Sequence, residues 1–421
     1  MPSNDGWTMN IKQLALCFVA LAVTSHSYAM VADNRYFPWY GQPYARTAEK
    51  RSNVNAELFF MTGNEAYGNS SKERKGIPEV WGTYDQKLAS EALIALGITS
   101  PLLAQWQLQK VIEWNTNQKI EGQGVLLRGE WYLPFGFSLG ASSGLMRVNC
   151  NQSFSLPRET RVTNLGLTTA QEEELDRERR LMNDLIGLTG TQWSETGALD
   201  TQLYLRWGGI WDYKLKSRQV DAGVFAGVYL PSAKQRDINN SASIPFGGNN
   251  QTGLFVGADL ALELKEDVTF GMLVQLSNRL TGIQKERLPL KKENHLFGGT
   301  TGDVRVDQGV TFVWNPYFRF GDLQDGLGLH LGYTIASHAS DVWTDVRQDK
   351  TIAVELNEIY TRSNWNAEYL SLHLFYDSGK VTHKDAILPI ITFNWDIPIK
   401  FLGAKEVSKT HKIAVGLAFN F

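Results

Sequence analysis

Hydrophobic side chains recur at every second residue over long stretches of this chain, and this period constrains the fold more than any other feature. In the last ten residues, Ile413, Val415, Leu417, Phe419 and Phe421 alternate with small or polar residues. Successive side chains of a strand point to opposite faces, so this segment has one apolar face and one small or polar face. The same alternation recurs at 220–230, 254–264, 268–276, 310–320, 327–335 and 370–376. The sequence therefore predicts long β-strands.

The pattern predicts twelve strands, at 56–62, 119–133, 135–148, 199–213, 217–230, 252–264, 268–280, 307–320, 327–339, 364–377, 385–398 and 411–421. Five of the connections are short, namely 134, 214–216, 265–267, 321–326 and 378–384, and five are long, namely 63–118, 149–198, 231–251, 281–306 and 340–363. An even number of strands with short turns at one end and long loops at the other is the pattern of a single antiparallel, up-and-down transmembrane β-barrel. A soluble β-sandwich is the alternative, and it does not require this asymmetry of loops.

Two segments of the long loops have a helical pattern instead. Asp85 is a candidate cap for a helix over 85–97. Thr168 or Thr169, followed by Gln171 and Glu172, forms a candidate capping box for a helix over 168–187. The second of these helices is interpreted either as a protrusion that binds a receptor or a cell, or as a solvated helix folded over the barrel mouth. We favour the second interpretation.

The first residues predict export from the cytoplasm. An apolar run at 14–23 is too short to span a bilayer, and Ser27 and Ala29 supply the small residues of a cleavage site. We therefore divide the chain into a signal peptide at 1–29, an N-terminal periplasmic segment at 30–54 and a barrel at 55–421. Cleavage leaves Cys150 as the single cysteine, which excludes an intramolecular disulfide and a cysteine-based metal cluster. We expect no metal site and no cofactor.

If the apolar face contacts lipid, the opposite face lines the lumen. The charged and polar residues assigned to that inner face are Glu57, Arg128, Glu130, Arg206, Asp212, Asp221, Asp259, Glu263, Gln275, Arg319, His330, His373 and Asp396. A charge on the lipid face costs roughly 2–4 kcal/mol at the midplane, so this segregation follows from stability alone. Six of these residues are candidates for a charged constriction: Arg128, Glu130, Arg206, Asp259, Glu263 and Arg319. A structural salt-bridge network is the alternative, and we favour it.

The mature chain resembles the outer-membrane β-barrel proteins of Gram-negative bacteria, a porin-like class. The alternating strands, the loop asymmetry and the terminal Leu417, Phe419 and Phe421 carry this resemblance. It implies a location in the cell outer membrane, with outer-membrane lipid and the barrel-assembly machinery as partners, the machinery reading Leu417, Phe419 and Phe421 as its signal. A net charge of −3 argues against a nucleic-acid partner.

Three functions remain open. A barrel of twelve strands, with a radius of about 12 Å, lies between small filled barrels and large aqueous pores, which allows a passive or weakly selective channel for small solutes. The second hypothesis is a closed scaffold whose loops 63–118 and 149–198 bind a surface ligand or partner. The third is an outer-membrane hydrolase, for which His338 beside Ser337, Ser340 and Asp341 is the nearest constellation. The sequence lacks the G-x-S-x-G and H-E-x-x-H motifs, and we expect no enzyme.

Overall fold

The computed structural model describes residues 33–37, 52–70, 73–109, 111–160, 165–213, 218–382 and 388–421. The expected signal peptide and its cleavage site lie outside these residues. No helix in this part of the chain is both long enough and apolar enough to cross a membrane.

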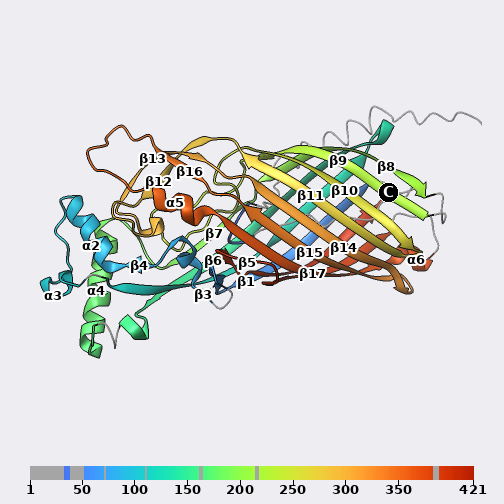
Figure 1. Ribbon diagram of the computed structural model, residues 1–421. Helices are drawn as coiled ribbons and strands as arrows, with labels where there is room; N and C mark the ends of the chain where they lie inside the picture. Colours follow the sequence, from blue (N-terminus) through green and yellow to red (C-terminus); the bar gives the residue numbers. More distant parts are fainter. Residues whose placement is uncertain are drawn as a thin grey trace, which may run out of the picture.

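Twelve strands of the described chain form one closed antiparallel sheet (Figure 1). Around the ring they are β1 (Asn53–Gly63), β20 (His411–Asn420), β18 (Pro389–Pro398), β17 (Trp365–Asp377), β15 (Leu327–His338), β14 (Thr311–Gln324), β11 (Val268–Arg279), β10 (Gly253–Lys265), β9 (Arg218–Leu230), β8 (Thr201–Tyr213), β6 (Phe137–Ser155) and β5 (Glu113–Tyr132). β1 pairs with β20 on one side and with β5 on the other, which joins the first and last strands. All twelve predicted strands are confirmed, with ends that differ by up to seven residues.

The remaining elements lie mostly at the long-loop end, on the left of Figure 1. They are β2 (Ala66–Tyr67), β3 (Arg74–Lys75), η1 (Ile77–Trp81), β4 (Tyr84–Asp85), α2 (Gln86–Ala95), α3 (Ala104–Gln107), α4 (Thr169–Leu185), β7 (Gln192–Ala198), β12 (Gly282–Leu288), η4 (His295–Phe297), β13 (Thr300–Asp307), β16 (Val342–Asp345), α5 (Asn357–Ser363) and β19 (Val407–Ser408). Two further elements, η2 (Pro134–Gly136) and α6 (Ser378–Thr382), lie in the short turns. Both expected helices are present as α2 and α4, capped by Asp85 and by the Thr168–Gln171 capping box.

An apolar belt surrounds the barrel. On β5, Leu127 and Trp131 face outward and are exposed, whereas Leu126 and Glu130 face inward and are buried. Further along the outer face of the same strand, toward the long-loop end, the side chains become polar from Gln123 back to Glu113. The belt therefore ends near Gln123, and β5 continues beyond it. Trp365, at the outer end of β17, points inward and is 2% exposed, and its ring stacks on that of His338.

The cap above the belt has an apolar core of its own. Leu175 and Met182 of α4 pack with Leu93 of α2 and with aromatic residues of the loops. The buried Arg287 of β12 ties several loops together, because its guanidinium donates to the carbonyl oxygens of Ile186, Ile238 and Gly298. Hydrogen bonds to these carbonyls satisfy a buried cation without a carboxylate partner. The helices α2 and α4 thus belong to the packed cap.

The described part of the segment expected in the periplasm, residues 33–37, is found at the opposite end of the barrel. The Arg35 carbonyl accepts from the Ser408 amide, and the Tyr36 carbonyl accepts from Thr410 Oγ1, both next to the outer end of β20. Ser52, in contrast, pairs with Phe421 at the short-turn end. The expectation for 30–54 is therefore wrong for residues 33–37. Interactions inside the barrel mouth hold this segment, and its own sequence contains no periodicity that would reveal them.

Candidate functional site

The outer half of the lumen is filled by three segments that are far apart in the sequence. Tyr36 and Phe37 of the N-terminal segment, Ile77 of η1 and Phe246 of the loop 231–252 form one cluster with inward-facing barrel residues such as Phe59. We refer to residues 33–37, η1 and the loop 231–252 together as the mouth plug. Aromatic and aliphatic side chains on the inner face of β1 and β6 explain why it binds there, since their burial is favourable.

An ion-pair cluster anchors the plug. Asp33 accepts two hydrogen bonds from Arg279 of β11, at 2.6 Å from Nε and 3.2 Å from Nη2. The Nη2 atom of Arg279 also lies 2.8 Å from Oδ2 of Asp200, and all three side chains are at most 5% exposed. Burial raises the pKa of Asp33, but the adjacent Arg279 more than offsets this, so the pKa lies below its usual value. Asp200 in turn accepts from the amides of Gly248 and Ala233, which links the loop 231–252 to the same arginine.

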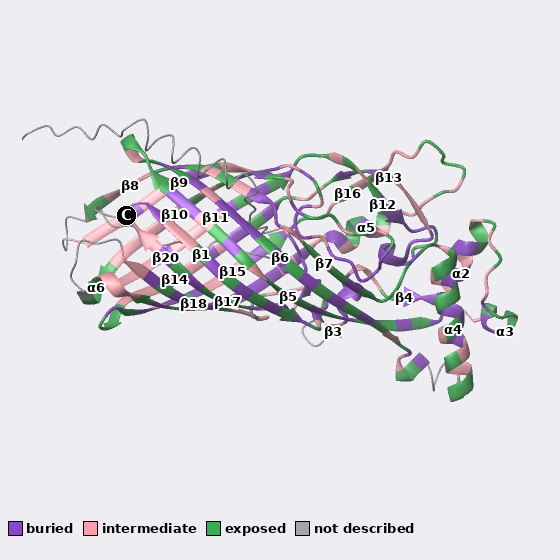
Figure 2. Ribbon diagram, turned by 180° about the vertical axis from the view of Figure 1, so that it is seen from behind, coloured by how far each residue is buried: buried purple, intermediate pink, exposed green. Residues whose placement is uncertain are grey.

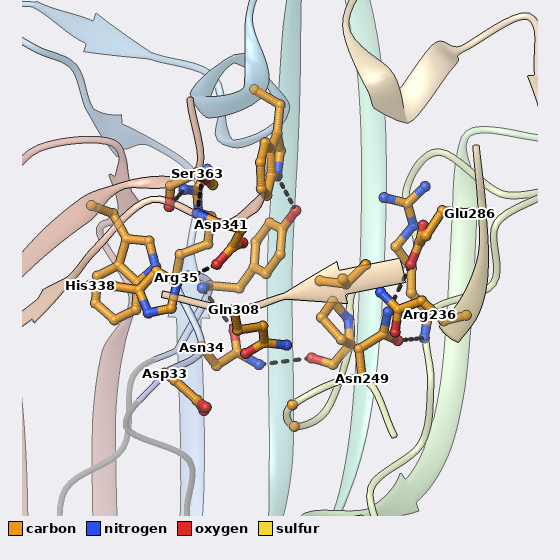
Figure 3. Close-up of a pocket in the computed structure, with 18 of the residues that line it drawn as sticks. Asp33, Asn34, Arg35, Arg236, Asn249, Glu286, Gln308, His338, Asp341 and Ser363 are labelled. Atoms are coloured by element: carbon orange, nitrogen blue, oxygen red, sulfur yellow. Dashed lines mark hydrogen bonds and ion pairs between the residues drawn. The ribbon is translucent and has the colours of Figure 1, made fainter. Parts of the chain in front are cut away.

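A pocket of about 110 Å³ lies between the plug and the small sheet of β12, β13 and β16 (Figure 3). Its aromatic wall contains Trp81, His295 and Trp343, with edge-to-face ring contacts at 4.3 Å and 5.6 Å. Arg35 lies over the Trp81 ring at 3.9 Å and donates to the carbonyls of Arg362 and Ser363. Figure 3 places Arg236, Asn249 and Glu286 together on one side of the pocket, opposite Arg35 and His338.

Deeper in the barrel, the structure brings together two of the six candidate constriction residues. Arg206 of β8 donates to Asp259 of β10 at 2.6 and 2.7 Å and to Asp221 of β9 at 2.7 Å. The Arg206 side chain is 4% exposed, so this triad is a buried salt-bridge network across three adjacent strands. This arrangement fits the structural alternative for Arg206 and Asp259.

The other four candidates make different contacts. Glu130 accepts from Tyr204 Oη at 2.8 Å, and Glu263 accepts from the Gln219 amide at 3.1 Å. The Arg319 guanidinium lies over the Phe375 ring at 4.6 Å on another part of the wall. Arg128 is partly exposed on β5, where its backbone pairs with Asn55 and Ser142. Whether these residues control the passage of solutes stays a prediction.

The lumen is more accessible toward the short-turn end. Along β10, the inward-facing Gly253 and Phe255 near the plug are buried, whereas Asp259, Ala261 and Glu263 are partly exposed. Figure 2 shows the same change along the barrel, with buried residues dominating toward the cap and intermediate ones toward α6. Closure of this barrel is thus concentrated in its outer half.

The hydrolase constellation is not assembled as the sequence suggested. His338 is bound on both ring nitrogens, with Nε2 2.9 Å from Asp341 and Nδ1 2.7 Å from Thr311 Oγ1. Thr311 is 1% exposed, and Ser340 bonds to Asn364 instead. The His338 group therefore ties β15 to β14 and to the following loop.

Sequence reasoning missed the residues that organise the mouth, namely Asp33, Arg35, Arg236 and Arg279. Arg279 lies two and four residues after Ser277 and Gln275 on β11, so its side chain points to the same, inner face. The alternation could therefore have assigned Arg279 to the lumen. Asp33 and Arg35 precede the first strand, and no periodic pattern includes them.

The belt decides the broad class of the molecule. A closed sheet leaves no unpaired edge, and an exposed apolar band around it requires lipid. The fold is that of an outer-membrane β-barrel.

No family model matches this chain, and no curated protein matches it. Similar solved structures include the COG4313 outer membrane channel from Pseudomonas putida F1, with 10% identity, a TM-score of 0.46, and 90% of this chain and 100% of that chain covered. The translocator domain of the autotransporter NalP from Neisseria meningitidis has 10% identity, a TM-score of 0.38 and 88% of each chain covered. The TodX deltaS2S3 mutant monoaromatic hydrocarbon channel has 10% identity and a TM-score of 0.37, with 94% of this chain and 97% of that chain covered.

Proposed function

We propose that this protein is an outer-membrane channel for small solutes whose outer entrance is closed by the mouth plug. The observation that carries this proposal is the way in which the lumen is closed. Small barrels are filled by the side chains of their own walls. Here the walls leave enough room for a separate segment of chain, 33–37, and the lumen is partly accessible on the other side of it.

The closure is held by interactions that can be broken without breaking the barrel. Residues 33–37 belong to no barrel strand, and the Asp33–Arg279 pair is their charged anchor. If Asp33 leaves, Arg279 keeps its contact with Asp200, so the wall retains a paired arginine. Such a segment is suited to move between a closed and an open state, because it is not hydrogen-bonded into the sheet of the barrel as a strand.

The test is single-channel recording in planar bilayers of the intact protein and of its Asp33→Ala variant. We expect discrete conductance steps that are at least several-fold more frequent or larger in the variant, because the plug loses its charged anchor. Asp184→Ala is the matched control, since Asp184 is an exposed aspartate on α4 that belongs to no segment of the mouth plug.

Both variants should keep the gel shift between boiled and unboiled samples that marks a folded barrel. Absence of conductance from the intact protein and from folded Asp33→Ala alike would contradict the channel. That result would favour the closed scaffold, in which the loops 63–118 and 149–198 contact a surface ligand.

A further inference from the structure

Several buried polar atoms converge on the mouth pocket without a hydrogen-bond partner among the described residues. The Nε and Nη2 atoms of Arg236, Oε2 of Glu286, Oε1 of Gln284 and Nε1 of Trp343 are all of this kind, and all four residues line the pocket. An unpaired buried polar group costs about 1–3 kcal/mol, and more if it is charged. A cluster of them around one cavity is therefore the mark of a site that a polar molecule completes.

The two unpaired nitrogen atoms of Arg236 indicate one chemical group of the molecule that binds here. The Nη1 atom of Arg236 forms a hydrogen bond with Nε2 of His295, at 3.5 Å. Burial, followed by the neighbouring cations Arg236, Arg35 and Arg362, holds the pKa of His295 well below its usual value, so this ring is neutral and can accept. The Nε and Nη2 atoms that remain form the side of a guanidinium that binds a carboxylate through two parallel hydrogen bonds.

Glu286 defines a second group. This side chain is 3% exposed, and its Oε1 atom accepts from Asn249 Nδ2 at 2.8 Å, which fixes the carboxyl group while Oε2 stays unpaired. Burial raises the pKa of Glu286, although the nearby Arg236 partly offsets this. A hydroxyl group suits either protonation state of Oε2, because it can both donate and accept a hydrogen bond. The Gln284 oxygen offers a second acceptor for the same hydroxyl.

The size of the pocket limits the rest of the molecule. A cavity of roughly 150 Å³ accommodates benzene, so 110 Å³ accommodates a compound of roughly three or four carbon atoms. The rings of Trp81 and Trp343 provide an apolar wall for its carbon chain.

From these contacts we propose that the mouth pocket is a binding site for a small hydroxycarboxylate, with Arg236 bound to the carboxylate and Glu286 bound to the hydroxyl. The inference goes beyond the channel and does not depend on it, since binding is measured on the intact protein without any transport. If the channel conducts nothing, the site can still bind, and the two failures are distinguishable.

The test is calorimetric titration of the purified full-length protein with sodium lactate, propionate and lactamide. We expect saturable binding of lactate, and binding at least about tenfold weaker for propionate, which lacks the hydroxyl, and for lactamide, which lacks the carboxylate. The change Arg236→Met should weaken lactate binding at least about tenfold, and Arg236→Lys should also weaken it, because lysine cannot form the paired contact.

Arg305→Met is the matched control, since Arg305 is exposed on β13 and does not line the pocket. Each variant is checked for the gel shift of the folded barrel before titration. The proposal is overturned if the intact protein shows no saturable binding of lactate. In that case the polar atoms of the pocket are hydrogen-bonded to water. The proposal is also overturned if folded Arg236→Met binds lactate as tightly as the intact protein does. If propionate binds as tightly as lactate, the pocket does not recognise the hydroxyl group, and the assignment of Glu286 to it is wrong.

Discussion

At the scale of single residues, charged side chains inside this barrel form ion pairs with one another. Arg206 contacts Asp221 and Asp259 at hydrogen-bond distance from three neighbouring strands. A buried ion pair contributes little net stability by itself, but the removal of one member leaves the others buried without compensation. We therefore interpret the triad as a structural feature that fixes the pairing of β8, β9 and β10, rather than as a site that attracts ions.

This arrangement predicts the effect of Arg206→Met. The change should destabilise the barrel by about 3–5 kcal/mol, because the two buried carboxylates lose the hydrogen bonds and the charge of the Arg206 guanidinium. Urea unfolding followed by tryptophan fluorescence measures the loss, with Arg147→Met as the control at an exposed position on β6. The triple variant Arg206→Met with Asp221→Asn and Asp259→Asn should recover much of the stability. If Arg206→Met shifts ion selectivity toward cations without loss of stability, the residue acts as a filter instead.

At the scale of elements, the segment 33–37 couples closure of the mouth to ionisation. The pKa of Asp33 is lowered in the folded state, so the ionised form is favoured by docking. Its contribution is fully present above the ordinary value near 3.9 and is lost as the pH falls through the lower, folded value. Asp200 behaves differently: burial raises its pKa, although Arg279 partly opposes this. Asp200 is therefore protonated first on acidification, and Asp33 remains the anion on Arg279.

The segment should accordingly stay docked from neutral pH down to about pH 4 and release only in stronger acid. Bilayer conductance recorded across this range measures the release, with Asp33→Asn as a comparison that should already be open at neutral pH. The titratable and charged groups near Asp33 include Arg279, Asp200, Tyr229 and His338. Closure that weakens as the pH rises would be incompatible with this anchor.

At the scale of the whole molecule, the change from apolar to polar side chains on the outer surface indicates where the lipid bilayer ends. On β5, Gln123 pairs with Arg147 of β6, and both are exposed, whereas Leu127 lies four residues closer to the short turns among apolar neighbours. The outer limit of the lipid thus lies near the Gln123–Arg147 pair. Beyond it, β5 and β6 continue into the cap as a stem with a polar exterior.

The depth assignment can be tested with two substitutions on the same face of one strand. Leu127→Arg should cost roughly 2–4 kcal/mol, because it places a cation in the hydrocarbon layer, whereas Gln123→Arg should cost no more than about 1 kcal/mol. Reversible urea unfolding in lipid vesicles gives both values. Equal costs at the two positions would show that the belt has been placed at the wrong height.

The sequence by itself determined the strands and their faces. Alternation is a local property, and lipid enforces it on each strand separately, so Leu127 and Glu130 could be assigned to opposite faces without knowledge of their neighbours. The caps of α2 and α4 were equally predictable, because a capping residue and its target amide are two or three positions apart.

Only the tertiary structure decided what fills the barrel. Asp33 meets Arg279 across 246 positions of sequence, and the Arg236 edge of the pocket is completed by β12, η4 and β16. Lumen charges must be compensated, but any carboxylate that reaches the right depth can do so, and stability alone does not select which one. Closure of the sheet into a ring brings these residues within hydrogen-bond distance, and that requires all twelve strands to be in place.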